Sequence, residues 1–335
     1  MADKVRWGVL STASIGLRRV IPAMQAGEQA TIAAIASRDC GKAEAATRQF
    51  GIPRAYGSYE ELLADSSIEA IYNPLPNHLH LEWSAKAAEA GKHVLCEKPL
   101  TMNAAEARHL LRVRDRTGVK IGEAFMVRTH PRWLRVRELV RSGRIGTLQA
   151  VTGSFSYFNR DPQNIRNSVA RGGGALLDLG CYPITLSRFL FDAEPVRVMG
   201  SIARDQEMGT DYLTSAILEF PSGRCVFTCS TQLAYTQWMQ LLGTEARIEI
   251  DRPINPLNEQ PSCIHIDDGK AMPASRQAEE IPWCNQFTVQ GDLFSKAIRE
   301  GGPVPVPLED SVRNMAVIDA VFRSVNTGKW ETPES

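Results

Sequence analysis

The alternation of strand-like and helix-like runs over the first 125 residues is the feature that most constrains the fold. Apolar runs typical of buried strands occupy residues 5–10, 31–36, 69–72, 93–96 and 119–125. Helical patterns lie between them at residues 15–26, 40–50, 79–90 and 103–117. Strands that alternate with helices of this length form βαβ units, so the pattern predicts a parallel sheet in a domain covering residues 1–124.

The pattern changes after residue 124. Helices are expected at 131–142 and 175–191, and a strand at 148–158. Five strand-like runs then follow without helices between them, at residues 196–203, 213–220, 224–231, 238–242 and 246–250. Such a succession favours an open, mainly antiparallel sheet. We therefore predict a second α/β domain over residues 125–335, with 252–285 as a polar loop. Helices at 286–300 and 308–326 close the chain, and the last helix can pack back on the first domain.

Composition narrows the classes of partner. The chain has 335 residues, enough for about two domains. Its formal net charge is zero, which argues against a nucleic acid or an anionic membrane as partner. No apolar run reaches the roughly 18 residues of a membrane span. The N-terminus leads directly into a strand, so no signal peptide is expected. Seven Cys without a Cys-x-x-Cys pair indicate free thiols and a cytoplasmic protein.

The first strand is followed by a turn that resembles a dinucleotide-binding turn. Residues 11–16 sit where a G-x-G-x-x-G fingerprint belongs, after a strand and at the start of a helix, but only Gly16 remains of its glycines. Ala13 is the smallest replacement for the second glycine, and Ser11 and Thr12 add hydroxyls near a helix N-terminus that favours anions. Ser11, Thr12, Ala13 and Ile15 are candidate cofactor-binding residues. A plain strand–turn–helix explains the same pattern.

The end of the second strand bears on which cofactor is used. An NAD site places an acidic residue there to bind the ribose hydroxyls. This chain has Ser37 and Arg38 instead, with Lys42 one helical turn further on and Asp39 one place late for the acidic role. A cation and a hydroxyl suit a 2′-phosphate, so the sequence favours NADP. A solvated loop arginine is the alternative.

Lys98 is the candidate for proton transfer in the first domain. It follows the apolar residues Val94 and Leu95 and precedes Pro99, which stops regular structure. In open α/β sheets, ligands bind outside the carboxyl ends of the strands. Partial burial there is expected to lower the pKa of Lys98 towards the range useful for proton transfer. Alone, Glu-Lys-Pro is a weak motif.

Three motifs together resemble the Gfo/Idh/MocA family of oxidoreductases. Residues 76–80 resemble its P-N-x-x-H turn, residues 90–99 match its A-G-K-H-V-x-x-E-K-P segment, and residues 174–182 correspond to its G-G-x-x-x-D-x-G-x-H motif. The resemblance implies an N-terminal Rossmann domain and a C-terminal α/β domain. Where many members have His, this chain has Tyr182. That variant resembles the branch with glucose–fructose oxidoreductase, NADP-dependent aldose (xylose) dehydrogenases and dimeric dihydrodiol dehydrogenase.

The resemblance also implies roles for individual residues. Lys98, Tyr182 and Asp178 correspond to catalytic positions, and Tyr182 with Lys98 would act on the substrate hydroxyl. Further cofactor-binding positions are Pro74, Leu75, Asn77, His80, Glu97 and Lys98. Arg128, Arg166, Asp178 and Tyr182 are the substrate candidates. No metal site is predicted, although His78, His80, Cys96 and Glu97 lie close in sequence.

Without the resemblance, several of these residues have simpler explanations. Asp178 and Tyr182, four apart, share one helix face. They could be an N-terminal helix acid and a buried tyrosine. Arg166 could be a solvated loop cation. His130, beside Arg128, could be structural.

The function expected from these patterns is NADP-dependent hydride transfer at a hydroxyl of a sugar, such as oxidation of an aldose to a lactone. Oxidation of a trans-dihydrodiol is the second choice of substrate. A dinucleotide-sensing regulatory protein and a nicotinamide-dependent glycosidase remain as alternatives. The open sheet suggests a homodimer or homotetramer, because an uncovered apolar face is typical of an interface.

Overall fold

The computed structural model describes residues 4–257, 259–270 and 276–334, and these form two compact units. The first unit contains Met1–Thr129 and Cys284–Val312, and the second contains His130–Trp283 and Arg313–Ser335. The units therefore divide the chain differently from the boundary expected at residue 124. Helix α8 (Gln286–Glu300) belongs to the first unit, where Ser295 Oγ accepts a hydrogen bond of 3.0 Å from Trp7 Nε1. Its amphipathic pattern predicts a helix but does not say which sheet the helix covers.

The first unit contains a six-stranded parallel sheet with the strand order β3-β2-β1-β4-β5-β6. This is the order of a doubly wound dinucleotide-binding fold, so the predicted Rossmann sheet is confirmed. The largest side chains of its core are fully buried, among them Trp7 and Tyr72. The strands are β1 (Val5–Leu10), β2 (Ala30–Ala36), β3 (Arg54–Tyr56), β4 (Ala70–Asn73), β5 (His93–Cys96) and β6 (Ile121–Glu123).

Helices connect these strands, and their start points follow the capping residues. Asp39, Ser58 and Asn103 each accept a hydrogen bond from a backbone N–H of the following turn, at α2, α3 and α5. The sequence pattern missed β3 and α3, because three and six residues are too few for a period to show. The helical segments are η1 (Gly16–Val20), α1 (Ile21–Gln25), α2 (Cys40–Phe50), α3 (Tyr59–Ala64), η2 (Asn77–Leu79), α4 (His80–Glu89), α5 (Ala104–Thr117) and η3 (Met126–Arg128).

The second unit contains an eight-stranded open sheet with the order β14-β13-β12-β11-β7-β10-β9-β8. Its strand pairs are antiparallel except β7 with β10, which confirms the predicted mainly antiparallel sheet. The expectation of a loop over residues 252–285 is wrong, because β13 and β14 lie there. The strands are β7 (Leu148–Phe158), β8 (Arg197–Arg204), β9 (Asp211–Phe220), β10 (Gly223–Ser230), β11 (Gln232–Gly243), β12 (Arg247–Asp251), β13 (Ser262–Asp267) and β14 (Gln277–Ile281).

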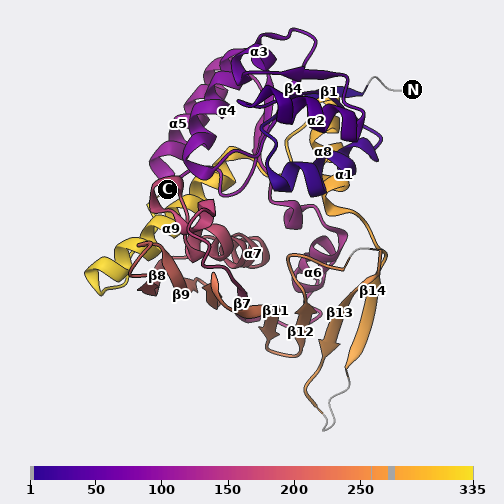
Figure 1. The fold of residues 1–335 in the computed structure, drawn as a ribbon. Coiled ribbons are helices and arrows are strands. Elements are labelled where there is room, and N and C mark those ends of the chain that lie inside the picture. Colours follow the sequence, from indigo (N-terminus) through magenta and orange to yellow (C-terminus); the bar gives the residue numbers. More distant parts are fainter. Residues whose placement is uncertain (1–3, 258, 271–275, 335) are drawn as a thin grey trace. The chain divides into compact units, whose positions relative to one another are not determined.

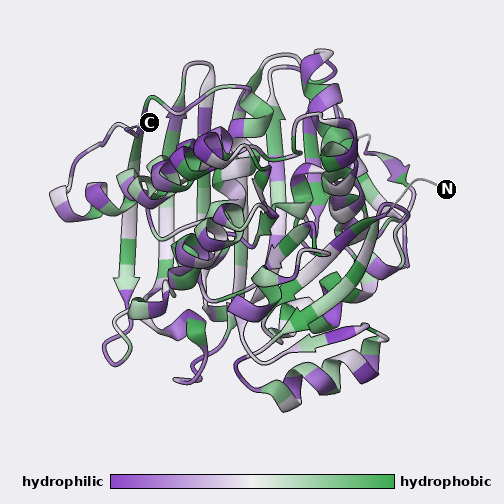
Figure 2. Cartoon of the chain, turned by 90° about the horizontal axis from the view of Figure 1, so that it is seen from above, coloured by the Kyte–Doolittle hydropathy of each residue, from purple (hydrophilic) through white to green (hydrophobic). Residues whose placement is uncertain are grey.

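Helices of the second unit lie on one side of this sheet (Figure 1). The inner strand residues Val151, Cys225 and Phe227 are buried, whereas Val226 and Trp238 on the other face remain 38% and 42% exposed. Figure 2 shows hydrophilic and hydrophobic residues mixed along the helices. The helical segments are α6 (Pro131–Arg141), η4 (Ile165–Asn167), η5 (Val169–Arg171), η6 (Leu176–Gly180) and α7 (Cys181–Phe191), and α9 (Leu308–Thr327) begins in the first unit.

Within the described residues, no helix has both the length and the apolar character needed to cross a bilayer.

Candidate active site

The turn after β1 has the backbone shape of a glycine turn although it lacks the glycine. Ser11 has φ of 69°, in the left-handed region that usually favours glycine. Its N–H donates to Ala36 O at 2.8 Å, and its Oγ accepts from the N–H of Ala13 at 3.2 Å. The local hydrogen bond helps to hold Ser11 in this conformation. Ser11, Thr12, Ala13 and Ile15 thus lie between the carboxyl end of β1 and η1, where an open sheet binds its ligand.

The corner after β2 gathers the residues expected to meet a 2′-phosphate. Ser37 is buried, and its Oγ accepts from the N–H of Asp39 at 3.2 Å. Arg38 is exposed and interacts with the hydroxyl of Tyr59, whose ring packs edge-on against Trp83 at 4.8 Å. Burial raises the pKa of Tyr59, while the nearby Arg38 charge lowers it. The aromatic pair therefore anchors a tyrosine beside the exposed cation.

Lys42 lies in the same corner but has a carboxylate beside it. Its Nζ is 3.7 Å from Asp39 Oδ2, and both side chains are more than half exposed. Asp39 also caps α2 by accepting from the N–H of Lys42 at 3.3 Å. Asp39, which lies one position after the place of the NAD-binding acid, thus caps α2, and Lys42 balances its negative charge.

His80 connects the turn after β4 with the segment that carries Lys98. The imidazole is fully buried, and its ring nitrogens lie 2.6 Å from Leu75 O and 2.8 Å from Pro99 O. Burial lowers the pKa of His80 to about 4, because desolvation outweighs the two carbonyls that favour the charged ring. Asn73 holds the same turn, since its Oδ1 accepts from the N–H of Leu75 at 3.2 Å. His80 therefore positions Leu75 and Pro99; the neighbouring candidates are Pro74 and, at the start of η2, Asn77.

Lys98 lies just beyond the carboxyl end of β5. It is half-buried and joined to Pro99 by a cis peptide bond. The preceding Glu97 accepts a hydrogen bond of 2.6 Å from the hydroxyl of Tyr72, and its N–H donates to Asn73 O at 3.0 Å. The backbone on either side of Lys98 is thus held by contacts to β4 and to His80.

In the second unit, Asp178 lies within a cluster of three polar side chains. Its Oδ2 accepts from the hydroxyl of Tyr157 at 2.7 Å and from Nε of Arg166 at 3.0 Å. The charge of Asp178 is the largest cause that raises the pKa of Arg166. Tyr182 is buried at the start of α7, with its ring 5.9 Å from that of Phe155. Sequence reasoning missed Tyr157, whose only signal is its inward position on β7.

The glycine-rich bend before η6 brings Arg166 and Asp178 together. Gly174 has φ of 123°, and a Cβ there would lie 1.9 Å from Asp211 Oδ1. Its N–H donates to Arg166 O at 2.9 Å, and its carbonyl accepts from the N–H of Asp178 at 3.1 Å. A Cβ on Gly173 would lie 2.3 Å from Arg166 O. Only glycines allow this approach, so the bend fixes both ends of the Arg166–Asp178 pair.

Two residues at the start of the second predicted domain have structural partners. Arg128 Nη1 is 2.9 Å from Asp310 Oδ2, and both side chains are largely buried. His130 caps α6 by accepting from the N–H of Arg132 at Nδ1. Burial, followed by the charge of Arg132, lowers the pKa of His130 to about 4. The ion pair explains Arg128 without a substrate, and the cap explains His130 without a role in the reaction.

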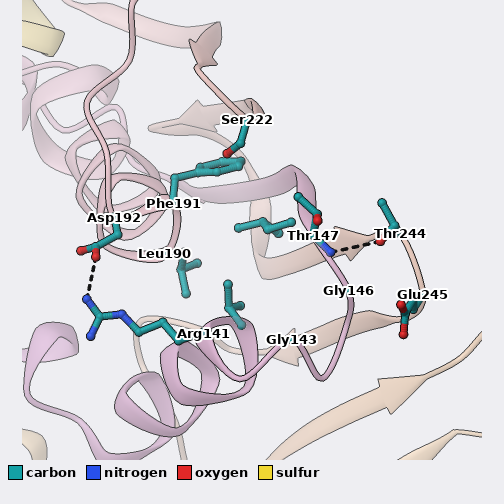
Figure 3. Close-up of a pocket in the computed structure, with 12 residues that line it drawn as sticks. Arg141, Gly143, Gly146, Thr147, Leu190, Phe191, Asp192, Ser222, Thr244 and Glu245 are labelled. Atoms are coloured by element: carbon teal, nitrogen blue, oxygen red, sulfur yellow. Dashed lines mark hydrogen bonds and ion pairs between the residues drawn. The ribbon is translucent and has the colours of Figure 1, made fainter.

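A cavity of about 550 Å³ in the second unit contains none of the candidate residues. Figure 3 shows Phe191 and Asp192 on its wall, at the opposite end of α7 from Tyr182, with Asp192 bound by Arg141 at 2.6 Å. The acidic side chains on its wall are Asp192, which is paired with Arg141, and Glu245. Among the described residues, no group of three or more His, Cys, Asp or Glu is placed to hold a metal ion.

Known proteins resemble both units. Residues 5–125 match the oxidoreductase family with an NAD-binding Rossmann fold, and residues 133–249 match the GFO/IDH/MocA C-terminal domain. The chain is 47% identical to an uncharacterised oxidoreductase of Rhizobium meliloti, ORF334, over 98% of this chain and 99% of the relative. It is 38% identical to D-xylose 1-dehydrogenase (NADP(+)) 2 of Haloferax volcanii, over 96% and 98%.

Among solved structures, KijD10, a 3-ketoreductase from Actinomadura kijaniata in complex with NADP and TDP-benzene, superposes with a TM-score of 0.90. The two are 30% identical, and the match covers 96% of this chain and 98% of KijD10. These matches confirm the resemblance drawn from the three motifs. The chain belongs to the Gfo/Idh/MocA family of oxidoreductases, with an NAD-binding Rossmann domain followed by the family's C-terminal domain.

Proposed function

We propose that the protein is an NADP-dependent oxidoreductase that transfers hydride between nicotinamide and a secondary or anomeric hydroxyl of a sugar, such as an aldose oxidised to its lactone. The preference for NADP rests on the turn after β2, where Ser37 and Arg38 occupy the place of the acidic residue of an NAD site. Two relatives support it, because the Haloferax enzyme carries NADP(+) in its name and KijD10 was solved with NADP. The sugar substrate rests on the Haloferax enzyme, whose name gives D-xylose.

Residues of both units would take part in this reaction. Ser11, Thr12 and Ala13 would face the pyrophosphate, and Pro74, Leu75, Asn77, Glu97 and Lys98 would line the nicotinamide end. When bound, nicotinamide accepts or supplies the hydride. Tyr182 would accept the proton of the reacting hydroxyl, and the ammonium of Lys98 would stabilise the tyrosine anion that this transfer requires. Arg166 and Asp178 would bind neighbouring substrate oxygens.

We also propose that the chain forms a homodimer and that it is a cytoplasmic protein. The first predicted domain would bind the cofactor, and the second would bind the substrate and form the homodimer. The outer face of the eight-stranded sheet supports an interface. Ser201, Ser215, Thr228 and Ser154 lie side by side across it, with Trp238 next in the row. All seven cysteines are free thiols, which suits a cytoplasmic protein.

A trans-dihydrodiol remains the second candidate substrate, because it presents the same neighbouring hydroxyls to Arg166 and Asp178. A panel of aldoses, polyols and dihydrodiols with NADP⁺, followed by NADPH absorbance, tests the proposal. We expect steady NADPH formation with at least one aldose. If cofactor binds but no compound yields NADPH, the enzyme assignment would give way to a dinucleotide-sensing protein. Release of free sugar from a glycoside, with cofactor retained through purification, would instead indicate a glycosidase.

A further inference from the structure

Arg166 and Asp178 form an ion pair at the candidate substrate site. Arg166 Nε lies 3.0 Å from Asp178 Oδ2, on side chains that are 45% and 13% exposed. An isolated guanidinium binds carboxylate or phosphate through two parallel hydrogen bonds. Here an aspartate already stands against the guanidinium, and an incoming anion would meet that negative charge. The pair therefore offers polar contacts without a net charge.

The pair also offers donors and acceptors side by side. Of the five N–H groups of a guanidinium, the one on Nε is used by Asp178, and no hydrogen bond from either terminal amino group of Arg166 is found among the described residues. The carboxylate of Asp178 is an acceptor. Each hydroxyl of a diol can both donate and accept. Two neighbouring hydroxyls of a sugar therefore match the pair better than a carboxylate, which can only accept.

The surroundings keep the pair in place before any substrate binds. The backbones of Arg166 and Asp178 are both hydrogen-bonded to Gly174, and Tyr157 donates to the same Asp178 oxygen that Arg166 contacts. A side chain on Gly173 would overlap the carbonyl of Arg166. The hydroxyl of Tyr157 on β7 and the guanidinium of Arg166 on η4 thus converge on one carboxylate, and the glycine bend holds the backbone of both members of the pair. These contacts preorganise the pair for a ligand.

We infer that the Arg166–Asp178 pair selects an uncharged sugar with neighbouring hydroxyls over one that carries a carboxylate at the same place, and that Tyr157 is a positioning residue for the pair. This inference rests on the proposed function and narrows its substrate class. Asp178 serves here as a charge-balancing partner, so removing its charge should alter which sugar is preferred as well as the rate.

The test compares D-glucose with D-glucuronate, which differ by the oxidation of one CH₂OH to a carboxylate. The quantity measured is the ratio of kcat/KM for the two sugars in wild type, Asp178→Asn and Arg166→Gln. We expect wild type to prefer glucose. Asp178→Asn should shift the ratio towards glucuronate by roughly tenfold, because Arg166 then carries an unbalanced positive charge. Arg166→Gln should shift it by a similar factor in the opposite direction.

Two further variants separate this effect from general damage. Arg160→Gln is the matched control: it removes a cation from the same loop, where Arg160 is paired with Asp205 at 3.3 Å, and should leave the ratio unchanged. Tyr157→Phe keeps both charges but loses the 2.7 Å hydrogen bond to Asp178. It should raise KM for glucose more than it lowers kcat.

The outcomes also separate this inference from the proposed function. If both sugars lose activity by the same factor in Asp178→Asn, the pair is only structural and the inference is overturned. A wild-type preference for glucuronate overturns it as well. If wild type forms no NADPH with any sugar, the proposed function fails and this inference fails with it. Activity on glucose with opposite shifts in the two charge variants supports both.

Discussion

At the scale of single residues, Arg38 carries the choice of cofactor. It is exposed at the end of β2, and within the described residues its partner is the hydroxyl of a buried tyrosine, Tyr59. A charge-assisted hydrogen bond to a phosphate contributes about 1.5–3 kcal/mol. We therefore predict that Arg38→Ala weakens NADP⁺ binding roughly 10- to 100-fold and changes NAD⁺ binding little.

Fluorescence titration of both cofactors measures this preference directly. The matched control is Arg48→Ala, which removes an exposed arginine from α2, the helix that follows Arg38, where Arg48 is paired with Glu44 at 3.8 Å. It should leave both affinities unchanged. Wild type that binds NAD⁺ more tightly than NADP⁺, or equal losses for both cofactors in Arg38→Ala, would contradict the assignment.

The second prediction for a single residue concerns His130 and the pH dependence of the protein's stability. Burial lowers its pKa in the folded protein from the ordinary value of 6.5 to about 4. The unfolded chain therefore binds a proton that the folded chain does not as the pH falls below 6.5, so stability present at neutral pH is lost towards pH 4. Between pH 7.5 and pH 5 we expect a loss of about 2 kcal/mol from this residue.

Denaturant unfolding at the two pH values tests the effect. His130→Asn keeps a side chain that can cap α6, and it should show a smaller fall in stability on acidification than wild type. His109→Asn replaces an exposed histidine on α5 and should behave like wild type. If wild type and His130→Asn lose the same stability on acidification, His130 does not remain neutral in the folded protein.

At the scale of elements, the glycine bend before η6 is the feature whose geometry matters most. A residue other than glycine at 174 would have φ of 123° and a Cβ 1.9 Å from Asp211. Backbone strain of this kind costs about 1–3 kcal/mol, and the steric overlap adds to it. We predict that Gly174→Ala lowers the free energy of unfolding by about 2 kcal/mol or more and weakens substrate binding.

The control for this change is Gly302→Ala, since a Cβ there meets nothing within 4 Å and its φ is not in the left-handed region. Thermal and denaturant unfolding of both variants provide the comparison. A Gly174→Ala protein as stable as Gly302→Ala would show that the bend can relax. The positions of Arg166 and Asp178 would then not depend on it.

Elements are also where sequence reasoning worked best and where it failed. Strands and helices long enough to repeat their hydrophobic pattern several times were predicted to within a few residues. Burial of one face dictates that pattern. Short or polar elements such as β3 and β14 were missed, since their pairing depends on a neighbouring strand and not on their own residues. The same holds at the site: Lys98 and Tyr182 belong to motifs, whereas Tyr157 acquires its role through β7 and its contact with Asp178.

At the scale of the whole molecule, we predict a homodimer formed through the outer face of the eight-stranded sheet. Trp238 and Val226 are 42% and 38% exposed there, beside a row of small serine and threonine side chains. Small side chains on this face would allow two copies to approach closely and bury the exposed apolar groups. Light scattering at micromolar concentration should give twice the mass of the chain.

Trp238→Asp should convert that dimer to a monomer, because it would bury an unpaired charge at the interface. The control is Leu134→Asp, at an apolar residue on α6 that is 47% exposed and lies away from this face. It should remain dimeric. A wild-type protein that is monomeric under these conditions would rule out the interface.

We propose that Lys98 and Tyr182 act together on the proton of a sugar hydroxyl. The most direct test is a double-mutant comparison of turnover in wild type, Tyr182→Phe, Lys98→Met and the double variant. General acid–base groups contribute about 10²–10⁴-fold, so each single change should lower turnover by that order, with NADP⁺ affinity nearly unchanged in Tyr182→Phe. Because the two residues would act as a unit, the double variant should lose much less than the product of the single losses. Turnover near that of wild type in either single variant, or losses that simply multiply in the double variant, would contradict the claim.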